Sequence, residues 1–250
     1  MADKTRRVAL VTGASRGLGA AIAERLGTDG YAVAVNYARS EQGARAVVDR
    51  IGAAGGRAAA FRADVTDESG VTALVEAVRG ELGPVDTLVL NATGPQPTTA
   101  AADLDWQVLL DQLSFFVKSP VLLLAAVLPD MVAAGRGRVI HIGSDVIERL
   151  PIGNSAYAAA KYAQLGLARI WAKELAPLGI TVNTVAPGWV PVERHAAADP
   201  ALLQRYVDGV PAGRFGTPEE IAAAVSFLAG DDSAFVVGAR LTVNGGSTVG

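Results

Sequence analysis

The chain has 250 residues, of which 50% are hydrophobic and 19% are charged. That composition supplies a large apolar core and does not fit intrinsic disorder. The formal net charge is -3 and the cationic residues are scattered, so a concentrated positive face for nucleic acid is not expected. The sequence holds no cysteine, which excludes disulfides and thiolate chemistry, and its two histidines, His141 and His195, do not make a metal site.

Membrane segments are not expected from the hydrophobic runs. The apolar stretch Val8–Val11 behind the basic start is far too short for a signal-peptide core. The longest apolar run, Val121–Leu128, is followed by Pro129 and lies well below the ~20 residues of a membrane span. We therefore expect a cytoplasmic protein that binds neither membrane nor nucleic acid.

Short runs rich in β-branched residues alternate with longer Ala-rich segments that have helical apolar spacing. Near-continuous apolar strands indicate a sheet covered on both faces. Alternation of strands and helices indicates right-handed crossovers and a parallel sheet. We predict one α/β domain over residues 1–250, a doubly wound Rossmann-type sheet of about seven strands. The predicted strands begin at Val8, Ala32, Ala59, Thr87, Arg138, Ile180 and Arg240.

The first predicted strand runs into the segment TGASRGLG at residues 12–19, which a helix follows. Glycines at such a turn let the backbone approach a ligand, and the N–H groups at the helix start face an anion. The spacing is T-G-x-x-x-G-x-G, a variant of the commoner dinucleotide motif. A dinucleotide site is the prediction, and a glycine-rich turn without a ligand is the alternative.

The same segment also matches the G-x-S-x-G elbow of α/β-hydrolases at residues 13–17. In that interpretation Ser15 is a nucleophile and His195 is the only late base. The sequence shows no HGGG-type oxyanion loop, and Gly19, Tyr157 and Lys161 stay unexplained. A serine hydrolase is therefore the weakest hypothesis.

The end of the second predicted strand bears on the choice of cofactor. It continues through Asn36, Tyr37, Arg39 and Ser40 with no acid before Glu41. An acid there would bond the ribose 2′-hydroxyl and select NAD. Arg39, together with Arg16 of the glycine turn, suits a 2′-phosphate because arginine pairs with phosphate through a charge-assisted fork. The prediction is NADP(H).

Tyr157 and Lys161 lie four residues apart in a predicted helix and therefore share a helix face. A nearby cation favours phenolate and lowers the pKa of tyrosine from ~10, toward a value useful for proton transfer near neutral pH. An exposed helix pair is the alternative. Ser144 follows the strand predicted over 138–143, and ligands of an open parallel sheet bind beyond the carboxyl ends of strands. Gly13, Asn36, Asp64, Asn91 and Pro187 fall at further strand ends.

The long connection after the sixth predicted strand is the least regular segment. It covers residues 189–213, is rich in proline, alanine and charge, and precedes a helix predicted from Pro218. Long irregular segments in compact domains are usually functional. We predict a substrate lid there, and an ordinary surface connection is the alternative.

In combination these motifs resemble the short-chain dehydrogenase/reductase family over the whole chain. LVLNATG after the fourth strand, PG at 187–188 and VNGG near the end complete the likeness. Residues 210–228 resemble most the 3-oxoacyl-acyl-carrier-protein reductase branch. The resemblance implies an NADPH-dependent ketoreductase. In it Tyr157 gives a proton to the carbonyl oxygen, Ser144 hydrogen-bonds that oxygen, and Lys161 holds the ribose hydroxyls.

The resemblance also implies partners and binding residues. The substrate would be an acyl or ring-type carbonyl compound, 3-oxoacyl thioesters included, in a largely apolar pocket. A homotetramer or homodimer and an acyl carrier protein are the implied protein partners, with Arg136 and Arg138 as candidate carrier contacts. The implied substrate residues are Thr93, Gln96, Ser144, Ile152, Tyr157 and Trp189. The implied cofactor residues are Gly13, Ser15, Arg16, Gly17, Leu18, Gly19, Asn36, Tyr37, Arg39, Ser40, Asp64, Val65, Asn91, Ala92, Tyr157, Lys161, Pro187, Gly188 and Val190.

Three positions depart from the family pattern. Leu113 stands where the family usually has an asparagine of a water-mediated proton relay, Thr93 alters the turn after the fourth strand, and Val192 replaces a threonine that contacts the nicotinamide carboxamide. These departures leave a second hypothesis open, a catalytically impaired nucleotide-binding sensor or scaffold of the same fold.

Overall fold

In the computed structural model, which describes residues 7–193 and 199–249, seven parallel strands form one sheet in the order β3-β2-β1-β4-β5-β6-β7. β1 pairs with both β2 and β4, so the chain reverses its direction of winding there. The predicted doubly wound sheet is confirmed. Its strands are β1 (Val8–Val11), β2 (Ala32–Tyr37), β3 (Arg57–Arg62), β4 (Thr87–Leu90), β5 (Gly137–Ile142), β6 (Ile180–Pro187) and β7 (Arg240–Val243).

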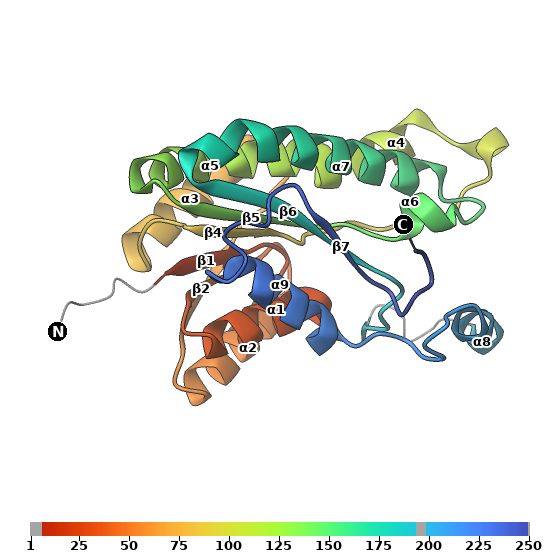
Figure 1. Cartoon of the computed structure of the whole chain (residues 1–250), viewed down its shortest axis with the longest axis horizontal. Helices are drawn as coiled ribbons and strands as arrows, with labels where there is room; N and C mark the ends of the chain where they lie inside the picture. Colours follow the sequence, from red (N-terminus) through yellow and green to blue (C-terminus); the bar gives the residue numbers. More distant parts are fainter. Residues whose placement is uncertain (1–6, 194–198, 250) are drawn as a thin grey trace.

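Helices cover both faces of the sheet (Figure 1). Every residue of β1, β2, β4, β5 and β6 is buried, because each strand has helices above and below it. One face carries α1 (Gly17–Thr28), α2 (Glu41–Ala53) and α9 (Pro218–Ala229). The other carries α3 (Glu68–Glu81), α4 (Trp106–Leu113), α5 (Ser119–Ala134) and α7 (Ser155–Leu175).

α4 and α5 form one helical run through a π-helical turn, η2 (Ser114–Lys118). The run Trp106–Ala134 is long and apolar enough to meet a length-and-composition test for a membrane span. Its α5 half packs on α3 and β5, and the α5 residues Leu123 and Val127 point into the hydrophobic core. Packing in the helical layer over the sheet therefore accounts for the apolar face of the α5 half.

The segment predicted to be irregular, residues 189–213, contains the helix α8 (Pro200–Asp208). The prediction was wrong over these nine residues. Asp199 caps the helix by accepting a bond from the Ala201 N–H at 2.9 Å, and Pro200 takes the first helical position. Both are ordinary features of a helix start. Residues 194–198 lie outside the described residues.

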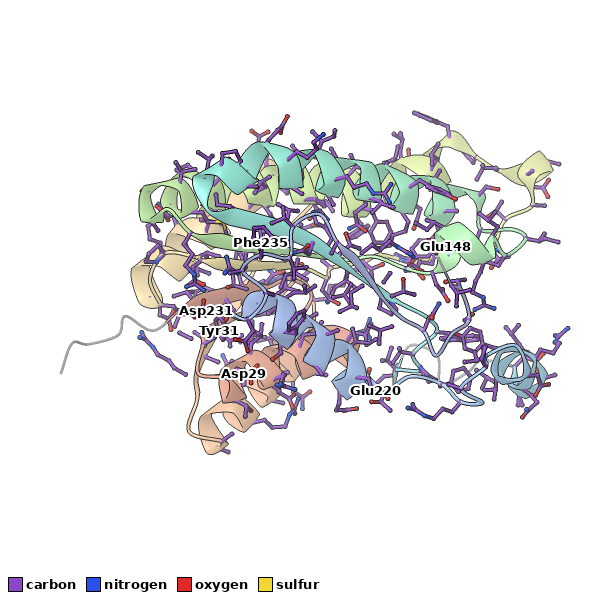
Figure 2. The ribbon with its side chains drawn as sticks, in the orientation of Figure 1. Asp29, Tyr31, Glu148, Glu220, Asp231 and Phe235 are labelled. Carbon is purple, nitrogen blue, oxygen red and sulfur yellow. The ribbon has the colours of Figure 1, made fainter. Side chains whose placement is uncertain are left out.

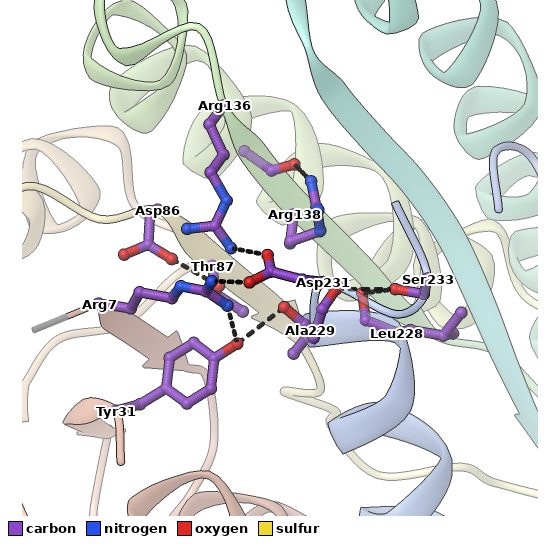
Figure 3. A network of polar contacts seen from close by, with 12 residues as sticks. Arg7, Tyr31, Asp86, Thr87, Arg136, Arg138, Leu228, Ala229, Asp231 and Ser233 are labelled. Carbon is purple, nitrogen blue, oxygen red and sulfur yellow. Dashed lines mark hydrogen bonds and ion pairs between the residues drawn. The ribbon is translucent and has the colours of Figure 1, made fainter. Parts of the chain in front are cut away.

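A network of ion pairs lies at the amino ends of the strands (Figure 3). Asp231, which follows α9, pairs with Arg7 and with Arg136 at 3.3 Å, and Arg138 is 4% exposed at the start of β5. β5 runs from this edge toward Ser144 at the other edge. The expectation that Arg136 and Arg138 lie near the mouth of the substrate site is therefore wrong, because the direction of β5 places them at the opposite end.

Candidate active site

The turn after β1 is braced by two asparagines from neighbouring strands. Asn36 at the end of β2 accepts a bond from the Gly13 N–H at 3.2 Å and donates to the Ala63 carbonyl at 3.2 Å. Asn91 after β4 donates to the Thr12 carbonyl at 2.8 Å, and its own N–H donates to Thr12 Oγ1 at 2.9 Å. Three of the predicted strand-end residues therefore meet at one place, and both amides are engaged with the backbone.

The glycines of this turn form a close-fitting cradle. Gly13 and Gly17 have φ angles of 63° and 55°, which favour glycine. A Cβ on Gly19 would come within 2.5 Å of Asn91 Nδ2 and of the Gly13 carbonyl oxygen. In the described part of the chain no side chain caps the start of α1 after Arg16, although Ser40 and Asp67 cap α2 and α3. The first N–H groups of α1 are therefore suited to an anion such as a pyrophosphate.

The residues predicted to hold the adenosine end lie on adjoining turns. Arg16 and Arg39 are both exposed. A Cβ on Gly43 would lie 2.6 Å from the Ser15 carbonyl oxygen, so the start of α2 packs against the glycine turn. Asp64, which is exposed, accepts bonds from the N–H and hydroxyl of Thr66 at 2.9 and 2.7 Å. Two other residues predicted to contact the cofactor, Tyr37 and Val65, are 7% and 4% exposed in the hydrophobic core.

The predicted catalytic residues meet at the carboxyl end of β5. Lys161 Nζ donates to the carbonyl of Ile142, the last residue of β5, at 2.7 Å. The same nitrogen lies 5.7 Å from the centroid of the Tyr157 ring, as expected for side chains one helical turn apart on α7. Ser144 Oγ accepts a bond from the Val146 N–H at 3.1 Å. A phenol, an ammonium and a hydroxyl therefore surround the end of one strand.

Two further residues contact Lys161 that the sequence did not single out. Gln164, 3% exposed, accepts a bond from Lys161 Nζ through Oε1 at 3.0 Å. The Phe116 ring centroid lies 3.8 Å from the same nitrogen, and this ring meets Tyr157 edge to face at 5.4 Å. The spacing of three residues from Lys161 could have identified Gln164. The position of Phe116 depends on the turn η2, which has no such sequence pattern.

Ser144 is supported from beneath by polar residues of β7 and of the short helix α6 (Val146–Arg149). Arg240 donates to the Ser144 carbonyl at 3.0 Å and pairs with Glu148, labelled in Figure 2, at 2.6 Å. Asp145 is 4% exposed, and burial raises the pKa of its carboxyl despite the nearby Arg149. Its N–H donates to the Pro187 carbonyl at 3.0 Å, which ties the ends of β5 and β6 together.

Five of the six predicted substrate residues come from three segments, and the sixth, Tyr157, lies on α7. The Thr99 N–H donates to the Gly153 carbonyl at 2.8 Å, joining the loop after β4 to the one before α7. In the first loop Gln96 donates to Thr93 Oγ1 at 3.0 Å. In the second, Ile152 is 97% exposed. These loops supply four of the predicted substrate residues: Thr93, Gln96, Ser144 and Ile152.

The third segment follows β6 and supplies Trp189. Its backbone N–H donates to the Tyr206 hydroxyl of α8 at 2.6 Å, and its ring meets those of Tyr206 and Phe215 with centroids 5.3 and 5.8 Å apart. Farther along, a Cβ added at Gly17 would be in ordinary van der Waals contact with Val192 and Glu193, at 3.4 and 3.5 Å. The start of the predicted lid therefore reaches the glycine turn at Val192 and Glu193, whereas Gly188 lies against Tyr206 and Asn244.

The hydrolase hypothesis makes Ser15 a nucleophile and needs a histidine base. His195, the base that it needs, lies outside the described residues. Among residues 7–193 and 199–249 no group of His, Cys, Asp or Glu could hold a metal ion.

A family model described as Enoyl-(Acyl carrier protein) reductase matches residues 13–248. The 3-oxoacyl-(acyl-carrier-protein) reductase FabG of Escherichia coli (strain K12) is 40% identical over 242 residues, 96% of each chain. The FabG of Staphylococcus aureus (strain Mu50 / ATCC 700699) is 37% identical over 245 residues, 97% of this chain and 98% of that protein.

Solved structures give the same result. A 3-oxoacyl-(acyl-carrier-protein) reductase from Agrobacterium tumefaciens C58 with NADP bound superposes with a TM-score of 0.90 at 38% identity, covering 97% of this chain and 95% of that one. A Serratia marcescens short-chain dehydrogenase/reductase mutant gives a TM-score of 0.91 at 36% identity, with coverage of 98% and 99%. The chain therefore belongs to the short-chain dehydrogenase/reductase family of oxidoreductases.

Proposed function

We propose that this protein is an NADPH-dependent ketoreductase that reduces the carbonyl group of an acyl or ring-type substrate. One observation carries the proposal. The Lys161 ammonium donates to the carbonyl of Ile142, the last residue of β5, and lies beside the Tyr157 ring. Ile142 precedes Ser144 by two residues in the chain. This edge of the sheet is where the doubly wound fold binds ligands.

In the proposed reaction the Tyr157 hydroxyl donates its proton to the substrate carbonyl oxygen. The nicotinamide, when bound, supplies the hydride. Ser144 Oγ already accepts a bond from the Val146 N–H, so its own proton is available for the same carbonyl oxygen. Lys161 stabilises the phenolate that Tyr157 becomes after proton transfer, because an adjacent cation favours the charged form of a phenol.

The proposed cofactor specificity rests on Arg16 and Arg39. The glycine cradle and the uncapped start of α1 fit a pyrophosphate, and the exposed Arg16 and Arg39 follow β1 and β2 on the turns that would flank the adenosine end of a bound dinucleotide. The A. tumefaciens relative has NADP bound. Specificity constants for NADPH and NADH with one substrate test this choice. A strong preference for NADH would refute it.

We further propose how this reductase is organised, where it works and what it binds. The chain acts as one NADP-binding domain over 1–250, with a substrate lid at 189–213. It assembles as a homotetramer or homodimer and works in the cytoplasm. FabG relatives are named as reductases of 3-oxoacyl-(acyl-carrier-protein), so an acyl thioester is included among the proposed substrates and an acyl carrier protein among the proposed partners.

The decisive experiment is a panel of ketones, 3-oxoacyl thioesters and alcohols assayed with both cofactors. Tyr157→Phe should lower kcat by about 10²–10⁴, the usual contribution of a positioned general acid. The control for loss of a buried phenol hydroxyl is Tyr31→Phe, at the edge of the sheet formed by the amino ends of the strands. The Tyr31 hydroxyl donates to the Ala229 carbonyl at 2.7 Å. Equal activity of wild type and Tyr157→Phe would refute the mechanism.

A catalytically impaired nucleotide-binding sensor or scaffold is the alternative. Val192 at the glycine turn and Leu113 at the end of α4 are the residues that favour it, because both replace polar groups of the family pattern with apolar ones. Tight NADPH binding without turnover over the whole panel would support this alternative.

A further inference from the structure

We propose that Gln164 and Phe116 are positioning residues that hold the Lys161 ammonium beside Tyr157. The inference rests on the proposed function and deepens it. It concerns the proton-transfer residue and the two neutral side chains that fix the charge next to it.

Lys161 places an ammonium in a site with little water. The residue is 5% exposed. A buried ammonium is unfavourable unless it is hydrogen-bonded or paired. Three of its contacts are to neutral groups from three elements: the Ile142 carbonyl of β5 at 2.7 Å, Gln164 Oε1 of α7 at 3.0 Å, and the Phe116 ring of η2 at 3.8 Å. Hydrogen bonds from a charged donor are stronger than neutral ones, and an aromatic ring face attracts a cation.

Gln164 is suited to this role by its position and by its chemistry. It lies three residues after Lys161 on the buried side of α7, so the two side chains reach each other within one helical turn. Its amide oxygen accepts a proton from the ammonium without carrying a charge. A carboxylate in the same place would hold the ammonium equally well but would cancel its field at Tyr157. The neutral acceptor keeps the charge that favours phenolate.

Phe116 connects the ammonium to the phenol. Its ring contacts Lys161 Nζ and meets the Tyr157 ring edge to face, with centroids 5.4 Å apart and planes at 67°. Phe116 is 3% exposed and belongs to the π-turn η2, where the chain between α4 and α5 is wider than an α-helix. Such turns are often found at functional sites. One ring therefore restrains both members of the catalytic pair.

The test is a pH profile of alcohol oxidation, in which the rate rises as Tyr157 becomes phenolate. Gln164→Met keeps the side-chain length but removes the carbonyl oxygen. We expect its pH midpoint to rise by about one unit and kcat near neutral pH to fall roughly tenfold, the effect of losing one charge-assisted bond. Gln164→Glu should also raise the midpoint because it cancels the charge. Phe116→Leu should raise it by removing the ring face.

The matched control is Gln112→Met, the same change at a buried glutamine of α4. Gln112 is 2% exposed and donates to the Pro95 carbonyl at 2.7 Å. General destabilisation by loss of a buried amide would affect Gln112→Met and Gln164→Met alike, which thermal unfolding will report. The Gln164 variants and Phe116→Leu should move the pH midpoint, whereas Gln112→Met should leave it unchanged. If Gln164→Met does not fold, Gln164→Glu and Phe116→Leu decide the question.

A second readout separates this inference from the proposed function. The phenolate of Tyr157 absorbs in the ultraviolet, and its titration is the difference between each protein and the same protein carrying Tyr157→Phe. This measurement needs no substrate. If wild type turns over nothing in the panel, the proposed function fails while the titration still tests the role of Gln164. A Tyr157 midpoint that is the same in wild type, Gln164→Met and Phe116→Leu would overturn the inference.

Discussion

His141 is a fully buried histidine in the middle of the sheet, and its protonation should limit stability in acid. It lies on β5 and is 0% exposed, with its ring 5.6 Å from that of Trp171. Neither ring nitrogen has a hydrogen-bond partner within the described residues. Burial, reinforced by the charge of Lys161, lowers the pKa of His141 to about 3. A histidine in an unfolded chain has a pKa of about 6.5.

The sign follows from this difference. Above about pH 6.5 the imidazole is neutral in both states and costs nothing. Below that pH, His141 is protonated in the unfolded chain but stays neutral in the folded one. The free energy of unfolding therefore decreases as the pH is lowered. Each unit corresponds to about 1.36 kcal/mol, and about 1.5 units separate 6.5 from pH 5. The loss attributable to His141 at about pH 5 is therefore about 2 kcal/mol, whatever its folded pKa, provided that it lies well below 5.

The assay is urea unfolding of wild type and His141→Leu at about pH 7 and about pH 5, followed by circular dichroism. Leucine fits an apolar site and does not titrate, so every other ionisation cancels when the two proteins are compared. Wild type should lose about 2 kcal/mol more than His141→Leu between the two pH values. Parallel losses in the two proteins would show that His141 is protonated or hydrated in the folded state, and would refute the reasoning.

Three further predictions concern other residues. Burial raises the pKa of Asp145, so its carboxylate is less stable in the folded than in the unfolded chain. Asp145→Asn should therefore unfold at a higher temperature than wild type near neutral pH, and this difference should vanish in acid. Equal melting temperatures at neutral pH would contradict this prediction. Thr217 and Glu220 form a capping box at the start of α9, and Thr217→Ala should lower the free energy of unfolding by about 1 kcal/mol in urea titrations, whereas an unchanged value would show that the box contributes nothing. Replacing Arg16 and Arg39 together by serine should raise KM for NADPH at least about tenfold and leave KM for NADH nearly unchanged, because only NADPH carries the 2′-phosphate. An equal rise in KM for both cofactors would show that these arginines bind the rest of the nucleotide.

The sequence was a good guide to the sheet because burial on both faces leaves a simple trace. The run at Val8 is apolar at every position, and the run at Ile180 is rich in β-branched residues with polar ones between them; each became a strand that is buried throughout. The residues at the strand ends then predicted which edge of the sheet holds the candidate site, without knowledge of side-chain positions. A parallel sheet brings all the carboxyl ends of its strands to one edge. Gly13 lies in the turn after β1, and Asn36 and Asn91 are hydrogen-bonded to that turn.

Two parts of the molecule were beyond sequence patterns, and one was misjudged. α8 is short, and only its Asp199 cap and Pro200 distinguish it from the loop around it. Phe116 faces Lys161 because η2 changes the helical register between α4 and α5, which a period of 3.6 residues does not reveal. The misplacement of Arg136 was avoidable, because the direction of β5 already separated it from Ser144 by the length of a strand.

The hydrogen bonds around the site hold its charged and backbone groups in place through contacts within the protein itself. Asn36 and Asn91 fix the glycine turn through the backbone, and Ile142 and Gln164 fix the ammonium. Groups held in place in advance need no reordering when charge develops on the substrate oxygen, which is the usual source of electrostatic stabilisation in enzymes. The segment after β6 differs, because its described contacts to α8 run through side chains such as Tyr206 rather than through a continuous strand. Substrate selection is therefore expected to depend on residues 189–213, while the rate of proton transfer depends on the braces beneath Tyr157.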